Sequence, residues 1–342
     1  MAALCDDLAF EVQQLETRTP LTSVFIGGGT PSLFKGESYG KLLTNVDQLL
    51  GIDNSCEITL EANPGTVDAE NFRAFRDAGI NRLSLGIQSF ADDKLKSLGR
   101  IHGGDEARRA IDIACRAGFE NFNLDLMFGL PGQSVSQAIK DLQTAIGFAP
   151  MHLSWYQLTI EPNTEFHSRP PSLPPEPAIV ELQEEGIALL ADAGFDRYEV
   201  SAFAQQGKRA AHNMNYWEFG DYIGIGAGAH GKLSKVATDQ VLRTRKKKQP
   251  DHYLAAALNR DAERRAVSRA ERPFEFLLNA LRLRHGFELP LFEKRTGVTF
   301  SEIEKTVEFQ ISQGLLVLQS GRLRTTDRGY RVLNSILEEF LD

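Results

Sequence analysis

One short junction occurs three times in this chain of 342 residues, and it limits the possible folds more than any other feature. It reads Asp77-Ala-Gly-Ile, Arg116-Ala-Gly-Phe and Asp192-Ala-Gly-Phe. In each copy the preceding segment has helical periodicity, so the glycine is expected to end a helix. Three residues later an apolar strand begins. Helix, glycine cap, short loop and strand form half of a repeated strand–helix unit, and such units imply a parallel sheet.

The apolar segments between these junctions predict both the strands and the helices that alternate with them. Strands are predicted at 23–28, 57–61, 82–89, 121–128, 152–160 and 197–203, and helices at 3–16, 33–50, 68–78, 91–98, 104–117, 134–147 and 178–193. At least five such units indicate an α/β barrel or partial barrel of the TIM type rather than a small open sheet. In that architecture, functional side chains lie at the C-terminal ends of the strands.

The pattern changes after Lys235, where helices precede a hairpin. Helices are predicted at 271–283, 301–314 and 328–341, and a β-hairpin at 315–326. This order is typical of a small winged-helix-like domain. We therefore predict two domains, a partial barrel over 1–235 and a helical, winged-helix-like domain over 236–342.

The charge and the apolar segments exclude several classes of protein. The net charge of -8 argues against a general nucleic-acid binder, whose surface would be basic. The basic run from Arg243 to Lys248 is interpreted as a solvated loop, with anion or partner binding as the alternative. No apolar stretch reaches the roughly 20 residues of a membrane span, and no secretory signal is recognised. Three widely spaced cysteines fit reduced thiols, so we expect a cytoplasmic protein.

Polar residues follow the predicted strands in an ordered series. The first strand runs into Gly27-Gly28-Gly29-Thr30, where bare backbone and a helix start expose amide N–H groups. Glu61, Gln88 and Asp125 stand at the ends of the next strands. Amides, a hydroxyl, two carboxylates and a carboxamide suit a ligand with an amino acid group and a ribose. The alternative is that Glu61 and Asp125 only cap loops.

Six ordered motifs give the chain a resemblance to radical S-adenosylmethionine (SAM) proteins. They are Gly27-Gly-Gly-Thr-Pro31, Glu61-Ala-Asn-Pro64, Leu85-Gly-Ile-Gln-Ser-Phe90, Leu98-Gly-Arg-Ile-His102, Asn123-Leu-Asp-Leu126 and Gly129-Leu-Pro-Gly-Gln133. The resemblance covers nearly the whole chain, and the six ordered motifs make it specific. Within these proteins the chain is most similar to the branch of coproporphyrinogen dehydrogenases and HemW-type haem chaperones.

The resemblance implies a SAM site made of eight residues. Gly28, Gly29 and Thr30 would hold the methionine end of SAM. The residues around its amino acid group and ribose would be Glu61, Gln88, Arg100 and Asp125, and Thr159 would lie near the adenine. The catalytic residues stay unassigned.

A second segment, Ala211-His-Asn-Met-Asn-Tyr-Trp217, distinguishes the two branches. His212 offers an imidazole to iron, and Tyr216 and Trp217 offer flat faces to a macrocycle. The alternative is that both aromatics are core residues and His212 is a hydrogen-bonded scaffold residue. The pattern His-Asn-x-x-Tyr-Trp is similar to the haem-chaperone signature, so the resemblance implies haem binding by His212, Tyr216 and Trp217.

One motif of the family is missing. Radical SAM proteins hold a [4Fe–4S] cluster on a Cys-x-x-x-Cys-x-x-Cys loop, and the spacing of Cys5, Cys56 and Cys115 cannot replace it. We interpret the chain as a truncated form beginning inside the helix that follows this loop, with a genuine cluster-less relative as the alternative. SAM reduction is not expected of the chain as given, so no metal ligand is assigned.

The function that we expect is a haem chaperone that binds haem and SAM and passes haem to an unidentified acceptor protein. Membrane-associated proteins are included among the candidate acceptors. The alternative is an oxygen-independent coproporphyrinogen III oxidase of porphyrin biosynthesis. An unrelated barrel aldolase is disfavoured because no lysine ends a predicted strand. The sequence indicates no nucleic-acid partner and no particular oligomeric state.

Overall fold

The computed structural model describes residues 1–66 and 68–341, and their internal contacts divide the chain into two units. We call residues 23–43 and 55–210 the sheet unit, and residues 1–22, 44–54 and 211–341 the C-terminal unit. The elements as far as the end of the sheet unit are, with η for a 3-10 helix, α1 (Ala2–Val12), β1 (Leu21–Ile26), η1 (Pro31–Leu33), α2 (Gly36–Leu50), β2 (Ile52–Ala62), η2 (Pro64–Thr66), α3 (Ala69–Asp77), β3 (Arg82–Gln88), α4 (Asp92–Ser97), α5 (Gly104–Arg116), β4 (Phe122–Phe128), α6 (Val135–Gly147), β5 (His152–Gln157), α7 (Glu165–Ser168), α8 (Glu176–Asp192), β6 (Asp196–Arg197) and β7 (Ala202–Ala204).

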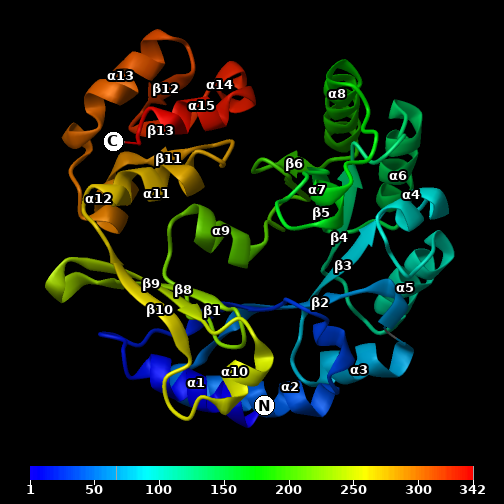
Figure 1. Cartoon of the computed structure of the whole chain (residues 1–342), viewed down its shortest axis with the longest axis horizontal. Coiled ribbons are helices and arrows are strands. Elements are labelled where there is room, and N and C mark those ends of the chain that lie inside the picture. Colours follow the sequence, from blue (N-terminus) through cyan, green and yellow to red (C-terminus); the bar gives the residue numbers. More distant parts are fainter. Residues whose placement is uncertain (67, 342) are drawn as a thin grey trace. The chain divides into compact units, whose positions relative to one another are not determined.

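The described strands from β1 to β7 form one sheet in the order β1-β2-β3-β4-β5-β7-β6. β2, β3, β4 and β5 are parallel neighbours, and Asp125 of β4 lies opposite Ser154 of β5. Helices α3, α5, α6 and α8 cover one face of the curled sheet (Figure 1). The predicted α/β class with a partial barrel is confirmed.

All three repeated junctions end a helix in the same way. Gly79, Gly118 and Gly194 have φ angles of 104°, 86° and 83°, which is the left-handed region. The next residue donates its N–H to the carbonyl five positions earlier, as in Ile80 to Phe75, Phe119 to Ala114 and Phe195 to Leu190. This is the Schellman motif, and the apolar residue after each glycine is buried. The prediction of helix–strand junctions is therefore confirmed.

The predicted strand at 197–203 is wrong. The structure has two short strands there, β6 and β7, which pair antiparallel with each other, and β7 also pairs antiparallel with β5. The turn between them is held by Glu199, whose carboxylate accepts hydrogen bonds from the N–H and the hydroxyl of Ser201. A local side-chain bond of this kind replaces the ladder bonds of a continuous strand.

The C-terminal unit continues from residue 211 with helices and two small sheets. Its elements are α9 (Ala211–Trp217), β8 (His230–Lys235), η3 (Val236–Thr238), β9 (Gln240–Lys246), α10 (Pro250–Ala255), β10 (Asp261–Val267), α11 (Glu271–Ala280), β11 (Phe287–Glu288), α12 (Leu289–Thr296), η4 (Phe300–Glu302), α13 (Glu304–Ser312), β12 (Leu316–Gln319), β13 (Arg322–Thr325), α14 (Asp327–Arg331) and α15 (Leu333–Glu338). Strands β10, β9 and β8 form an antiparallel sheet in that order.

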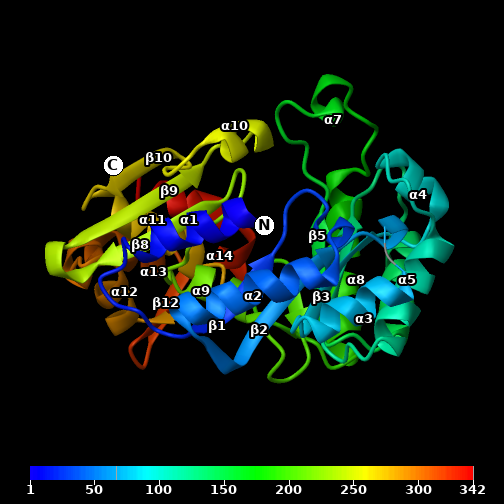
Figure 2. The same cartoon turned by 90° about the horizontal axis from the view of Figure 1, so that it is seen from below.

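Most of the basic run from Arg243 lies in β9, so its interpretation as a solvated loop is wrong. Lys246 is buried, and its ammonium group lies 2.7 Å from Asp7, 2.6 Å from Glu11 and 2.9 Å from Asp261. Arg264 adds a second cation 2.6 Å from Glu11. We call these five residues the ion cluster. Figure 2 shows α1, which carries Asp7 and Glu11, lying along this sheet.

The end of the chain has the predicted order of helices and hairpin. β12 and β13 form the hairpin, β11 pairs with β13, and Phe276, Phe287 and Phe292 pack edge to face in the core. The predicted single helix at 328–341 is wrong, because Val332 leaves the helical conformation and separates α14 from α15. The helix predicted at 301–314 begins with the short η4 instead. The domain boundary at residues 235 and 236 stays a prediction.

Candidate functional site

The glycine turn after β1 is shaped by backbone conformation. Gly28 and Gly29 have φ angles of 81° and 63°, where a side chain is disfavoured. A Cβ atom at Gly27 would lie 2.8 Å from the Glu61 carboxyl group. Gly28 donates its N–H to Glu61 Oε2 at 3.0 Å. Thr30 precedes η1 without making a side-chain cap, so its hydroxyl makes no bond to the helix start. The turn therefore brings the Gly28 amide to the carboxylate of the next strand.

Glu61 and Asp125 lie on β2 and β4 and affect each other electrostatically. Burial raises the pKa of Glu61, the Gly28 N–H lowers it, and the charge of Asp125 raises it again. Burial also raises the pKa of Asp125, and hydrogen bonds from Asn123 and Ser84 oppose this rise. Two carboxylates in partly dry surroundings favour a cationic or hydroxyl-bearing ligand.

Gln88 closes β3 in an unusual conformation and meets a residue that sequence reasoning missed. Gln88 has a φ of 68°, which is rare outside glycine, and it is 5% exposed. Tyr156 of β5 donates its hydroxyl to Gln88 Oε1 at 2.9 Å. Burial, together with the charges of Asp125 and Glu61, raises the pKa of Tyr156 to about 12. The charge of Arg100 opposes this rise. Tyr156 therefore lies among the predicted residues.

The remaining two predicted residues are more exposed. Arg100 follows α4. Burial lowers the pKa of the neighbouring His102, and the charge of Arg100 lowers it further, as it does that of Tyr156. Thr159 lies beyond β5, and its hydroxyl donates to Glu161 at 3.0 Å. Neighbouring side chains of the sheet unit thus include Glu61, Gln88, Arg100 and Asp125, whereas no contact joins Thr159 to them among the described residues.

His212, Tyr216 and Trp217 all lie on α9 of the C-terminal unit. The His212 and Tyr216 rings meet edge to face with centroids 4.7 Å apart, and Tyr216 lies 4.4 Å from Tyr222. Arg243 donates to the Tyr222 hydroxyl at 2.9 Å. The guanidinium of Arg282 lies 4.5 Å from the centre of the Trp217 ring. The three predicted residues are partly exposed, so all of them retain surface for a ligand.

Trp217 also carries an unused donor. Its Nε1 is buried and has no hydrogen-bond partner among the described residues. Buried indole N–H groups usually find an acceptor. The α9 segment therefore combines an imidazole, two aromatic faces and nearby arginines, which are groups suited to a flat anionic ligand.

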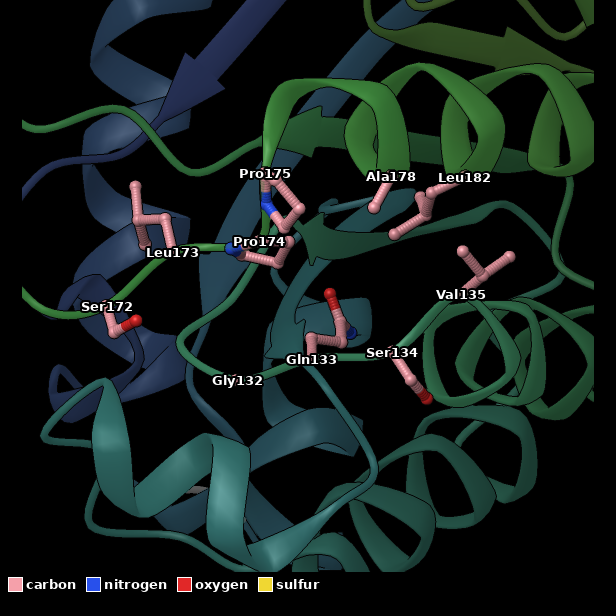
Figure 3. Close-up of a pocket in the computed structure, with 10 residues that line it drawn as sticks. All are labelled: Gly132, Gln133, Ser134, Val135, Ser172, Leu173, Pro174, Pro175, Ala178 and Leu182. Atoms are coloured by element: carbon pink, nitrogen blue, oxygen red, sulfur yellow. The ribbon is translucent and has the colours of Figure 1, made fainter.

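A pocket of about 330 Å³ lies elsewhere in the sheet unit, between the loop after β4 and the start of α8 (Figure 3). Its lining consists of Gly132, Gln133, Ser134, Val135, Ser172, Leu173, Pro174, Pro175, Ala178 and Leu182. None of the predicted site residues belongs to it. The Gln133 carboxamide accepts from Leu130 N–H, and the pocket shows no grouping of titratable side chains.

The residues present do not fit an iron–sulfur cluster. Cys5, Cys56 and Cys115 are not disulfide-bonded, and no group of three metal-binding side chains occurs among residues 1–66 and 68–341. Within the same residues, no helix is long and apolar enough to cross a membrane.

Comparison with known proteins identifies the family. Residues 4–145 match the Radical SAM superfamily, and residues 267–332 match the HemN C-terminal domain. The "Heme chaperone HemW" proteins of Haemophilus influenzae and Escherichia coli are each 46% identical, over 99% of this chain and 88% of theirs. A mouse protein, "Radical S-adenosyl methionine domain-containing protein 1, mitochondrial", is 37% identical over 92% of this chain and 74% of its own.

A solved structure has the same fold. The coproporphyrinogen III oxidase HemN of Escherichia coli superposes with a TM-score of 0.80 over 99% of this chain and 82% of its own, at 19% identity. The fold and the matched regions define a radical SAM protein with a HemN-type C-terminal domain. Near-full-length identity of 46% is more specific, and by it this chain belongs to the HemW family.

Proposed function

We propose that this protein is a haem chaperone that binds haem through α9, binds SAM in the sheet unit, and delivers haem to an acceptor protein. The observation that carries the proposal is the near-full-length identity of 46% with proteins named heme chaperone HemW. The composition of α9 supports it, since the helix holds a possible iron ligand and two aromatic rings in seven residues.

In the haem site, His212 supplies an imidazole nitrogen to iron, and Tyr216 and Trp217 contact the porphyrin face. Tyr216 packs against the edge of the His212 ring and restricts its orientation. Arg282, stacked on Trp217, is placed to pair with a carboxylate of the porphyrin. Haem itself contributes an iron that accepts a nitrogen ligand.

A haem titration with a matched histidine control tests this site. His212→Ala is expected to shift the Soret band and to weaken haem binding by about tenfold or more, because the iron loses one ligand. His252→Ala replaces an exposed histidine of α10 and is expected to change neither quantity. An unchanged spectrum and affinity in His212→Ala would remove His212 from the iron.

In the SAM site, Gly28, Gly29 and Thr30 hold the methionine end, and Glu61 pairs with the ammonium group. Asp125 accepts hydrogen bonds from the ribose hydroxyls, while Gln88 and Arg100 bind the remaining polar groups and Thr159 lies near the adenine. SAM supplies a sulfonium centre when it is bound. Calorimetry should give a SAM affinity that falls by about a hundredfold in Asp125→Ala, since two charge-assisted hydrogen bonds to the ribose are lost.

A second candidate is the oxygen-independent coproporphyrinogen III oxidase activity. The likeness to the HemN structure favours it at the level of fold alone. The family implies a [4Fe–4S] cluster, but the described cysteines do not fit one, so we derive no radical step for this chain. Anaerobic incubation with coproporphyrinogen III and SAM should yield no protoporphyrinogen; its formation would replace the chaperone proposal.

The setting of the proposed function follows from its chemistry. We place the protein in the cytoplasm, where the three cysteines, which form no disulfide, stay reduced. Its partners are haem and a haem-accepting protein, and we include membrane-associated proteins among the candidate acceptors. We propose no nucleic-acid partner, because the net charge is -8.

A further inference from the structure

A chain of buried hydrogen bonds runs from Tyr198 to Asp125 inside the sheet unit. The Tyr198 hydroxyl lies 2.8 Å from His152 Nε2, and His152 Nδ1 lies 2.6 Å from Asn123 Oδ1. Asn123 Nδ2 lies 2.8 Å from Asp125 Oδ1. Ser84 bridges the last two members, because it accepts from Asn123 Nδ2 at 2.8 Å and donates to Asp125 Oδ2 at 3.1 Å.

The chemistry of Asp125 determines the direction of every bond. A carboxylate only accepts, so the amide nitrogen of Asn123 must face it and the amide oxygen must face His152. His152 must then carry its proton on Nδ1. Burial, followed by the charge of Arg82, lowers the pKa of His152 well below its usual value, so the ring is neutral and Nε2 accepts from Tyr198.

The hydrogen-bond network is separated from solvent at Tyr198 and His152, and its other end fixes Asp125. His152 and Tyr198 are 0% exposed and Asn123 is 2% exposed. Such a network rigidifies the groups it joins when every member is satisfied. Each oxygen of Asp125 receives one of these bonds, and a carboxylate has about four acceptor positions. The unused positions are therefore held in one orientation.

We propose that Asn123, His152, Tyr198 and Ser84 are positioning residues that fix Asp125 as a double acceptor for the vicinal hydroxyls of a ribose. The inference rests on the proposed binding of SAM. It goes further, because it assigns the discrimination between ribose and deoxyribose to residues that do not touch the ligand. A freely rotating Asp125 would still attract hydroxyl groups but would not distinguish two of them from one.

The tautomer of His152 tests the proposed hydrogen-bond network without any ligand. A long-range proton–nitrogen NMR spectrum of the full chain separates protonated from bare imidazole nitrogens, and comparison with His152→Leu assigns the signal among the seven histidines. Protonation on Nδ1 alone is expected. Protonation on Nε2 alone would reverse the order of donors and overturn the inference, whether or not SAM binds.

A comparison of ligand affinities tests whether the fixed Asp125 distinguishes ribose from deoxyribose. Calorimetry would compare S-adenosylhomocysteine with its 3′-deoxy analogue, and the native chain should prefer the former by about tenfold. His152→Leu should remove most of this preference, and His152→Asn, whose amide N–H can stand at the position of Nδ1, should recover it. Asn81→Ala is the control. Asn81 directly precedes β3 and forms hydrogen bonds with the backbone of Cys56 and Ile58 in β2. The variant should keep the preference.

The two possible failures are distinguishable. If neither ligand binds the native chain while His152 is protonated on Nδ1, the proposed SAM site is wrong and the discrimination falls with it. If the ligands bind but His152→Leu weakens both equally, the SAM site stands and the positioning role is wrong.

Discussion

Glu61 and Asp125 lie close enough for the charge of one to raise the pKa of the other. Burial adds to this effect for both residues. Their ionisation therefore opposes folding in the absence of a ligand, as is common where a site is built for binding. A cation or a pair of hydroxyl groups would relieve the repulsion, which is consistent with the ligand proposed above.

Glu61→Gln should stabilise the ligand-free protein. The variant keeps an acceptor for the Gly28 N–H and removes one of two neighbouring charges. We expect the free energy of unfolding at pH 7 to rise by up to about 1 kcal/mol. Because the folded pKa of Glu61 is raised, the gain is full above that pKa and disappears as the pH falls to 4.5 and below. Urea titrations at several pH values measure it. A gain that persists in acid would point to another cause.

The sequence indicates individual site residues only where their chemistry is conspicuous. Carboxylates, glycines and a carboxamide at strand ends stand out, so Glu61, Gln88 and Asp125 were predicted. Tyr156 and His152 were missed as site residues because an aromatic residue within a buried strand is the ordinary content of a core. Their hydrogen bonds reach residues 68 and 29 positions away, and no local pattern records such distances.

At the scale of elements, the three Schellman motifs explain why most of the sheet was predictable. Each glycine ends its helix by a local rule, and the next strand begins two to four residues later. The antiparallel turn at 198–201 and the placement of the basic run in β9 were not predictable in this way. The turn depends on one buried glutamate, and β9 depends on carboxylates of α1 far away in sequence.

Gly118→Ala should destabilise the protein by about 1–2 kcal/mol, because the left-handed conformation disfavours a side chain. The new Cβ atom would meet Arg76 at 3.5 Å, an ordinary contact, so the cost is one of backbone conformation. Gly147→Ala is the matched control at the end of α6, where the new atom meets nothing within 4 Å. It should be neutral or slightly stabilising. Equal effects of the two substitutions on urea midpoints would contradict this account.

At the scale of the molecule, the ion cluster joins the beginning of the C-terminal unit to its sheet. Lys246 and its three carboxylates are at most 5% exposed, and Arg264 and the Tyr253 hydroxyl satisfy further oxygens. Burying these charges is costly, and only complete pairing offsets the cost. The cluster therefore specifies one arrangement of α1 against β9 and β10.

Lys246→Met should destabilise the C-terminal unit by about 3–5 kcal/mol, since it leaves three buried carboxylates with one cation. Arg245→Met, in the same strand, removes a half-exposed partner of Glu263 and should cost less than about 1 kcal/mol. Thermal unfolding of both variants measures the difference. The pKa of Lys246 is raised, so its stabilisation is complete below 10.5 and is lost as pH rises through the folded value. Similar losses in the two variants would show that the cluster contributes little.

The same cluster has a consequence for the order in which the protein takes shape during translation. Asp7 and Glu11 leave the ribosome early, but Lys246 follows 239 and 235 residues later. At roughly 5–20 residues per second, α1 waits on the order of ten to fifty seconds for its counter-charge. The sheet unit consists of residues 23–43 and 55–210, all of which leave the ribosome before Lys246. During translation, therefore, all residues of the sheet unit are available before the ion cluster can form.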